Sequence, residues 1–234
     1  MPKRTLFKVA GLVLAMAIGI IATPSSAVSA IGGTISTNYY DIQTCNMPGQ
    51  KAWITFDDGG TRTQARSILK GLKEKNVKGV FFATGEWARA NPGIMRRIVR
   101  DGHYLGNHSS THQDFSNLSN RQIRQEVAGG VQGTSSPMLL RPPYGSGTFD
   151  PRVQAVATGM GYQMCYWTVD TRDWDGASVD EIVRLATYGK AGVTPPLERN
   201  GMMLLHMQVA NSIVALPRVI DAVRARGVKL PKLY

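Results

Sequence analysis

The amino-acid sequence predicts an α/β fold: a distorted or incomplete (β/α) barrel of parallel strands, with its active site at the C-terminal strand ends. Short apolar runs alternate along the chain with helical patterns, the order expected of βαβ units. The length of 234 residues, less a cleaved leader, suits one barrel domain. Polar residues directly follow several apolar runs, and the C-terminal ends of parallel strands share one face, where such barrels carry their active sites.

The first 30 residues have the pattern of a secretory signal rather than of a folded element. Three basic residues precede an apolar run over residues 9–22, which is shorter than the roughly 20 residues that span a bilayer. Small residues follow, and we expect cleavage after Ala30, with Ala27 as a second site and an uncleaved membrane anchor as the alternative. The sequence therefore predicts a secreted or cell-wall-associated protein.

After the signal, residues 31–50 are expected to form a lead segment and residues 51–234 a single catalytic domain. Cleavage removes three of the 27 basic residues and none of the 16 acidic ones, so the net charge falls from +11 to +8. A basic surface favours acidic polymers such as anionic wall polysaccharides, although general solubility explains it equally well. We see no basic cluster interleaved with aromatic residues, so no nucleic-acid partner is expected. We expect a monomer that contacts a membrane only if the signal stays uncleaved.

The chain has two cysteines, Cys45 and Cys165. An even number in an exported chain permits one disulfide, and each of these cysteines flanks a strand of the expected barrel wall. Two buried free thiols are the alternative. We predict the bridge.

The strands are expected in the short apolar runs and the helices between them, with readable helix ends. Residues 91–92, Asn-Pro, predict an N-cap followed by proline in the first turn. Ser119 with Gln122, and Ser178 with Glu181, predict capping boxes. The expected strands are residues 52–56, 77–83, 103–106, 138–140, 163–169 and 202–205, with 227–230 as an additional candidate.

Two adjacent carboxylates, Asp57 and Asp58, stand where the first expected strand ends. Successive side chains on a strand point to opposite sides, so one carboxylate can turn to a metal while its neighbour faces the bound water. Gly59 permits a sharp exit from the strand. The alternative is an Asp-Asp-Gly turn with an N-cap for the helix after Thr61.

His108 and His112 are four residues apart, a spacing that brings two imidazoles to one side of a helical turn. Together with Asp58 they would offer two nitrogens and one oxygen, which leaves positions open for water and substrate. Such a set is typical of a catalytic metal site. Surface polarity and N-capping are the alternatives for an isolated histidine pair.

Three further segments carry polar residues at strand ends. Arg141 opens Arg-Pro-Pro-Tyr-Gly after the strand over 138–140, Asp170 opens a polar loop, and His206 ends an apolar strand. Taken singly each is weak, since the first two suit ordinary loops and His206 could be a core histidine bonded to a backbone carbonyl. Their shared position after strands favours one site.

These five segments, in this order, resemble the polysaccharide deacetylase family, also called the chitooligosaccharide deacetylase homology domain, a group of carbohydrate esterases. The likeness runs from about Lys51 to His206 and extends to residues 79–85 and 102–107. It implies a metal-dependent hydrolase that acts on carbon–nitrogen bonds and removes acetyl groups from N-acetylated sugars of a cell-wall or chitin-like glycan. The partner would then be an acetylated polysaccharide or oligosaccharide.

The resemblance also implies roles for the first group of residues. Asp57 would be the general base, and Arg141 would pair with it and orient it. Asp58, His108 and His112 would hold the metal, with zinc expected and cobalt as a substitute.

The second group lies on the other side of the implied substrate. His206 would be the general acid, and Asp173 would keep it charged. Tyr144 would give its backbone N–H to the oxyanion, while Trp174 and Leu204 would form walls of the pocket for the acetyl methyl group.

Other functions fit parts of this pattern. An O-acetyl xylan esterase of the same family would use the same residues, and a non-haem iron oxygenase also uses two histidines and a carboxylate. An oxygenase would not need the expected acid and base, and a catalytically idle wall-binding protein would not need the complete set. Gly60 stands where the family commonly has proline, and Met207 with Gln208 where an acidic residue is frequent, which bears on the shape of the cleft.

Overall fold

The computed structural model describes residues 35–234. The predicted signal over residues 1–30 lies outside the described residues, so its cleavage and its use as an anchor stay predictions. Within residues 35–234, no helix has the length and apolar character needed to cross a membrane.

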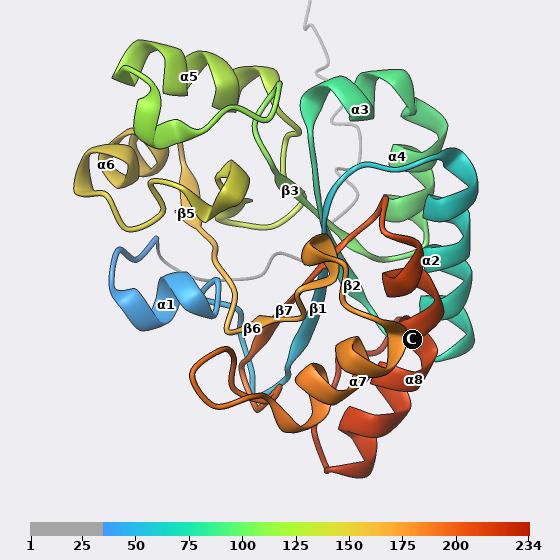
Figure 1. Ribbon diagram of the computed structural model, residues 1–234. Coiled ribbons are helices and arrows are strands. Elements are labelled where there is room, and N and C mark those ends of the chain that lie inside the picture. Colours follow the sequence, from blue (N-terminus) through green and yellow to red (C-terminus); the bar gives the residue numbers. More distant parts are fainter. Residues whose placement is uncertain (1–34) are drawn as a thin grey trace, which may run out of the picture.

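Seven strands form one parallel, curled sheet with the spatial order β5-β4-β3-β2-β1-β7-β6 (Figure 1). The outermost strands, β5 and β6, do not pair with each other, so the barrel is incomplete, as the sequence predicts. The strands are β1 (Trp53–Asp58), β2 (Gly79–Ala83), β3 (Tyr104–Asn107), β4 (Met138–Leu140), β5 (Tyr162–Met164), β6 (Val169–Asp170) and β7 (Met202–His206).

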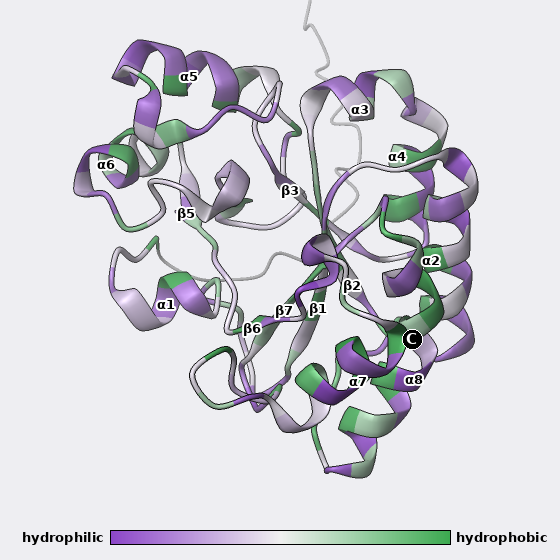
Figure 2. Ribbon diagram, in the orientation of Figure 1, coloured by the Kyte–Doolittle hydropathy of each residue, from purple (hydrophilic) through white to green (hydrophobic). Residues whose placement is uncertain are grey.

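Helices connect these strands and cover the outer side of the sheet (Figure 1). Apolar residues gather on the central strands and on the inner stripes of the helices, and polar residues on the outer helix faces (Figure 2). The α-helices are α1 (Tyr39–Gln43), α2 (Arg62–Glu74), α3 (Gly85–Ala90), α4 (Pro92–Arg100), α5 (Asn120–Gly129), α6 (Pro151–Gly159), α7 (Val179–Tyr188) and α8 (Ala210–Ala225). Single 3₁₀ turns are η1 (Phe115–Asn117), η2 (Pro143–Gly145) and η3 (Asp173–Asp175).

The central strand β1 is fixed on both of its sides. Ile54 and Phe56 are fully buried in the core between the sheet and the outer helices, and burial of such side chains contributes about 1.5 to 3 kcal/mol each. Thr55 and Asp57 point to the opposite side, where both accept hydrogen bonds from Arg141. The end of β1 is therefore a rigid place for functional groups.

Two of the expected strands differ in the structure. The apolar run over residues 163–169 is not one strand, because it leaves β5 after Met164 and joins β6 at Val169, on the opposite edge of the sheet. Residues 165–168 thus cross the opening of the barrel. Residues 227–230 form no strand; two separate hydrogen bonds, from Ala52 N to Lys229 O (2.9 Å) and from Lys78 N to Pro231 O (2.8 Å), hold the terminal segment.

The helices begin where the sequence predicts, but the capping hydrogen bonds differ at two of the three starts. The capping box of Ser119 is present. Asn91 precedes α4, but its side chain makes no cap and instead donates to Trp87 O (2.9 Å). Ser178 accepts from Glu181 N (3.2 Å), whereas the Glu181 carboxylate turns away to Arg184 and leaves that box half formed.

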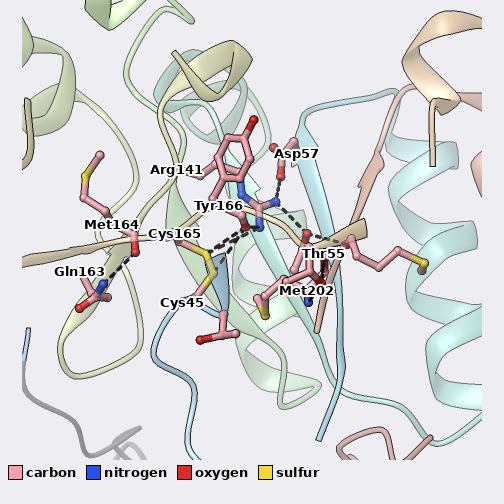
Figure 3. The surroundings of a disulfide bond; sticks show 12 residues. Cys45, Thr55, Asp57, Arg141, Gln163, Met164, Cys165, Tyr166 and Met202 are labelled. Atoms are coloured by element: carbon pink, nitrogen blue, oxygen red, sulfur yellow. Dashed lines mark hydrogen bonds and ion pairs between the residues drawn. A yellow bond between two sulfur atoms is a disulfide. The ribbon is translucent and has the colours of Figure 1, made fainter. Parts of the chain in front are cut away.

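The disulfide between Cys45 and Cys165 is present, which confirms the prediction (Figure 3). It joins the segment after α1 to the residue that follows β5, across a sequence separation of 120 residues. The Tyr166 N–H adds a hydrogen bond to Ile42 O (2.8 Å). Helix α1 is therefore attached covalently to the opening of the barrel.

We expect the double variant Cys45→Ser/Cys165→Ser to lower the free energy of unfolding by about 2 to 4 kcal/mol, because a long loop is no longer closed in the unfolded chain. Denaturant unfolding of both proteins measures this. Treating the parent protein with a reductant should reproduce the loss and leave the variant unchanged. Equal stabilities of parent and variant would contradict a stabilising bridge.

Candidate active site and metal centre

Asp58, His108 and His112 offer ligand atoms to one point at the C-terminal ends of β1 and β3. Asp58 Oδ1 lies 3.1 Å from His108 Nε2 and 3.0 Å from His112 Nε2. One ligand atom from each residue lies within 4.8 Å of the others. Two imidazole nitrogens and one carboxylate oxygen suit zinc and leave coordination positions open. The donor set therefore fits the divalent ion that the sequence predicts.

The histidine pair does not lie on a helical turn, contrary to the sequence interpretation. Residues 108–112 form an irregular loop, in which Ser109 (φ 64) and His112 (φ 65) have left-handed backbone conformations. His112 N donates to Ser109 Oγ (2.9 Å), and this turn brings the two rings to a centroid distance of 5.1 Å. A turn in the loop, and not a helix, therefore brings together two histidines that are four residues apart.

Neighbouring groups orient the ligand atoms. Arg141 O lies 2.7 Å from His108 Nδ1, and a carbonyl only accepts, so Nδ1 carries the proton and Nε2 keeps its lone pair for a metal. The carboxylate of Glu126 accepts from Ser110 N (3.0 Å) and Thr111 N (2.9 Å) and so fixes the loop between the histidines.

Asp58 holds its carboxylate toward the cavity through an unusual backbone. The alternation of a regular strand would direct it away from the side that Asp57 faces, but its φ of 68° turns it. Gln208 Nε2 donates to Asp58 Oδ2 (2.5 Å), which leaves Oδ1 for the histidines. Burial raises the pKa of Asp58, but its contacts with His108, His112 and Gln208 outweigh that effect and hold the pKa well below its ordinary value. The carboxylate is therefore ionised.

The second carboxylate, Asp57, is held by a buried arginine. Arg141 Nη1 donates to Asp57 Oδ1 (2.7 Å) and to Thr55 Oγ1 (2.7 Å), and its Nη2 donates to Tyr166 O (2.6 Å) (Figure 3). Asp57 Oδ2 lies 3.8 Å from His108 Nε2, on the metal side. Burial lowers the pKa of Arg141, and the adjacent charge of Asp57 opposes that shift. One Asp57 oxygen is thus fixed while the other faces the cavity.

The second charged pair of the site joins the imidazole of His206 to the carboxylate of Asp173. His206 Nδ1 lies 2.9 Å from Asp173 Oδ1, and Asp173 Oδ2 accepts from His206 N (2.7 Å) and Ser212 Oγ (2.5 Å). Burial lowers the pKa of His206, but the hydrogen bond and the charge of Asp173 outweigh it and raise that pKa to about 9. His206 therefore carries a proton at neutral pH, as a general acid must.

These groups meet in one cavity of about 450 Å³. Every residue that the sequence predicted for the site lines it, except Arg141 and Asp173, which lie behind Asp57 and His206. Trp174 stands half exposed on its wall, with Nε1 3.2 Å from Asp170 Oδ1, and Leu204 is buried in it. Tyr144 has a left-handed backbone (φ 59), and its ring lies 4.6 Å from that of His112.

Some contributors to this site were not found from the sequence. Glu126, Gln208 and Ser212 act through contacts between distant segments, which a local pattern does not contain. An acidic residue on the apolar side of α5 was the one available signal for Glu126, which is 9% exposed. His103 lies elsewhere: its Nδ1 accepts from Gly79 N (3.1 Å), and burial lowers its pKa to about 4.

Comparisons with known proteins agree with this geometry. The sequence profile of the family described as "Polysaccharide deacetylase" matches residues 45–165. The chain is 31% identical over 190 residues to a peptidoglycan-N-acetylglucosamine deacetylase of Bacillus cereus, covering 77% of this chain and 67% of that protein. It is 30% identical over 194 residues to a chitooligosaccharide deacetylase of Sinorhizobium fredii, covering 75% and 86%.

A solved structure shows the same fold. The family 4 carbohydrate esterase from Streptomyces lividans in complex with acetate superposes with a TM-score of 0.66 at 28% identity, covering 78% of this chain and 92% of that one. The predicted distorted barrel and the predicted class of hydrolase are thereby confirmed. The profile match over more than half of the chain, together with these relatives, shows that the chain belongs to the polysaccharide deacetylase family.

Proposed function

We propose that this protein is an exported, metal-dependent N-deacetylase that releases acetate from N-acetylated sugars of a cell-wall or chitin-like glycan. The observation that carries the proposal is that a candidate base, Asp57, and a candidate acid, His206, line the same cavity as the candidate metal ligands. Asp57 is paired with a cation, Arg141, and His206 with an anion, Asp173. Groups in such different surroundings can be ionised and protonated at the same pH.

A divalent ion held by Asp58, His108 and His112, most simply zinc, would make bound water more acidic and polarise the acyl oxygen. Asp57 then accepts the proton of the attacking water as the oxygen–carbon bond forms. The backbone N–H of Tyr144 donates to the oxygen on which negative charge builds. His206 gives its proton to the amine as the carbon–nitrogen bond breaks, so the products are acetate and a free amino sugar.

The relatives support the choice of an N-acetylated glycan. Those named above are described as deacetylases of peptidoglycan N-acetylglucosamine and of chitooligosaccharides. Peptidoglycan, as a cell-wall polymer, lies outside the cytoplasm, which agrees with the predicted signal. We propose that residues 51–234 form the catalytic domain, in which the loops at the strand ends set the specificity.

The purified mature chain should release acetate from N-acetylglucosamine oligomers or peptidoglycan faster than from acetylated xylan. The assay measures free acetate over this panel, with the ester substrate as the internal comparison. Acetate from xylan alone would replace the proposal by an O-acetyl esterase. No acetate from any substrate, in metal-loaded protein, would favour a catalytically idle wall-binding protein.

A further inference from the structure

A row of aromatic rings leads from the cavity to the surface of α1. Trp167 lines the cavity, and Tyr166 stacks on it at a centroid distance of 3.8 Å. Phe149 meets Tyr166 edge to face at 5.2 Å, and Tyr39 stacks on Phe149 at 4.7 Å. Phe149 is 38% exposed and Tyr39 62% exposed. We call these four residues the aromatic row.

The fold holds this row firmly. An added Cβ on Gly145, which lines the cavity, would lie 2.4 Å from the ring of Tyr166 and 2.7 Å from that of Trp167, so glycine allows both rings to pack against its backbone. Tyr39 belongs to α1, which the disulfide and the bond to Ile42 O attach to the segment after β5. These side chains are therefore already ordered before a ligand binds, which lowers the entropic cost of binding.

Exposed aromatic groups continuous with a binding cavity indicate a ligand surface, because soluble proteins seldom leave large apolar patches uncovered without use. A pyranose ring has an apolar face of C–H groups and a rim of hydroxyls. Tyr39 and Phe149 each use one ring face to stack on the other. The exposed parts of these two rings match the C–H face of a sugar and leave its hydroxyls in water. An uncharged sugar chain thus fits the row better than an anionic ligand does.

We propose that the aromatic row binds further sugar residues of an extended glycan whose acetylated unit occupies the cavity. This proposal rests on the proposed function. Three of its four residues, Tyr39, Tyr166 and Trp167, lie outside residues 45–165, the segment that the family profile matches, and Phe149 lies inside it. It would give this protein a preference for long chains over short ones.

Calorimetry can test the row without turnover, in the Asp57→Asn background, with N-acetylglucosamine oligomers from the disaccharide to the hexasaccharide. We expect affinity to rise with length. Phe149→Ala and Tyr39→Ala should weaken hexasaccharide binding about fivefold or more, as loss of an aromatic anchor does, and should flatten the length dependence. Tyr188→Ala is the matched control, because Tyr188 is 74% exposed on α7, outside the row and the cavity.

Loss of packing has to be separated from loss of a binding surface. Phe149→Leu keeps an apolar side chain beside Tyr166 but removes the ring, so it should retain the thermal midpoint and still weaken hexasaccharide binding. An unchanged length dependence in the row variants, or an equal loss in Tyr188→Ala, overturns the proposal. If the row variants behave as expected but the parent releases no acetate, the proposed function fails and the row stands.

Discussion

Replacing Asp57 by asparagine is expected to lower the rate of acetate release by about 10²- to 10⁴-fold, the usual contribution of a general base, while the bound metal stays. The asparagine amide oxygen can still accept the hydrogen bond that Arg141 Nη1 now gives to Asp57 Oδ1. It cannot take a proton from water. The proposed metal ligands Asp58, His108 and His112 are untouched, so metal content should not change.

His108→Ala is expected to lose both metal and activity, because it removes one of the three proposed ligands. Metal analysis beside the acetate assay separates the two variants. His103→Asn is the matched control, since His103 is equally buried but lies outside the cavity, and it should keep its metal.

Folding must be checked in the Asp57 variant, because it leaves the buried Arg141 charge without its partner, a change that can cost about 3 to 5 kcal/mol. Near-normal turnover by a folded Asp57→Asn protein would mean that the base is another group. A full complement of metal in His108→Ala would remove this histidine from the ligand set.

His206→Ala is expected to slow N-deacetylation by about 10²- to 10⁴-fold and to slow ester hydrolysis much less. An amine leaves only when it is protonated, whereas the alkoxide of an acetyl ester is a better leaving group and needs less help. The measurement compares acetate from N-acetylglucosamine oligomers and from acetylated xylan with both proteins. His206→Gln retains an amide donor for Asp173 and should behave as the alanine variant does. Equal losses on both substrates would argue against His206 as the acid.

The pH profile of the unmodified enzyme should fall on its alkaline side as His206 loses its proton. Its pKa is raised to about 9, and nearby positive charge in the metal-loaded enzyme lowers this value, so the limb should lie at or below pH 9. The pair with Asp173 stabilises the folded chain fully below the ordinary histidine pKa of 6.5, and this stabilisation is lost as the pH rises through about 9. A rate that stays flat across the alkaline range in the parent would contradict this assignment.

The order and the type of the elements could be predicted from the sequence, whereas breaks inside apolar runs could not. β1, β2 and β7 are short, buried and bounded by turn residues, so their pattern is unambiguous. Residues 163–169 look equally continuous, yet they cross from one edge of the sheet to the other because the barrel stays open. That depends on which strands pair, information that a local pattern does not hold.

For the site, residue types and strand ends indicated which groups meet, but not how the backbone delivers them. Asp58 and His112 reach the proposed metal position through left-handed backbone conformations, which are uncommon outside glycine, although aspartate and histidine adopt them more often than most residues do. Such strain persists only where surrounding contacts enforce it, here the bonds to Gln208 and Ser109. The spacing of the histidines was therefore informative while its helical explanation was wrong.

Zinc titration of metal-free protein tests the central claim most directly. Bound zinc and acetate release from N-acetylglucosamine oligomers are followed together as zinc is added. We predict that the rate rises in proportion to bound zinc, reaches its maximum at one ion per chain and is negligible before the first addition. Full turnover by the metal-free protein, or saturation with zinc without any release of acetate, would contradict a metal-dependent N-deacetylase built on Asp58, His108 and His112.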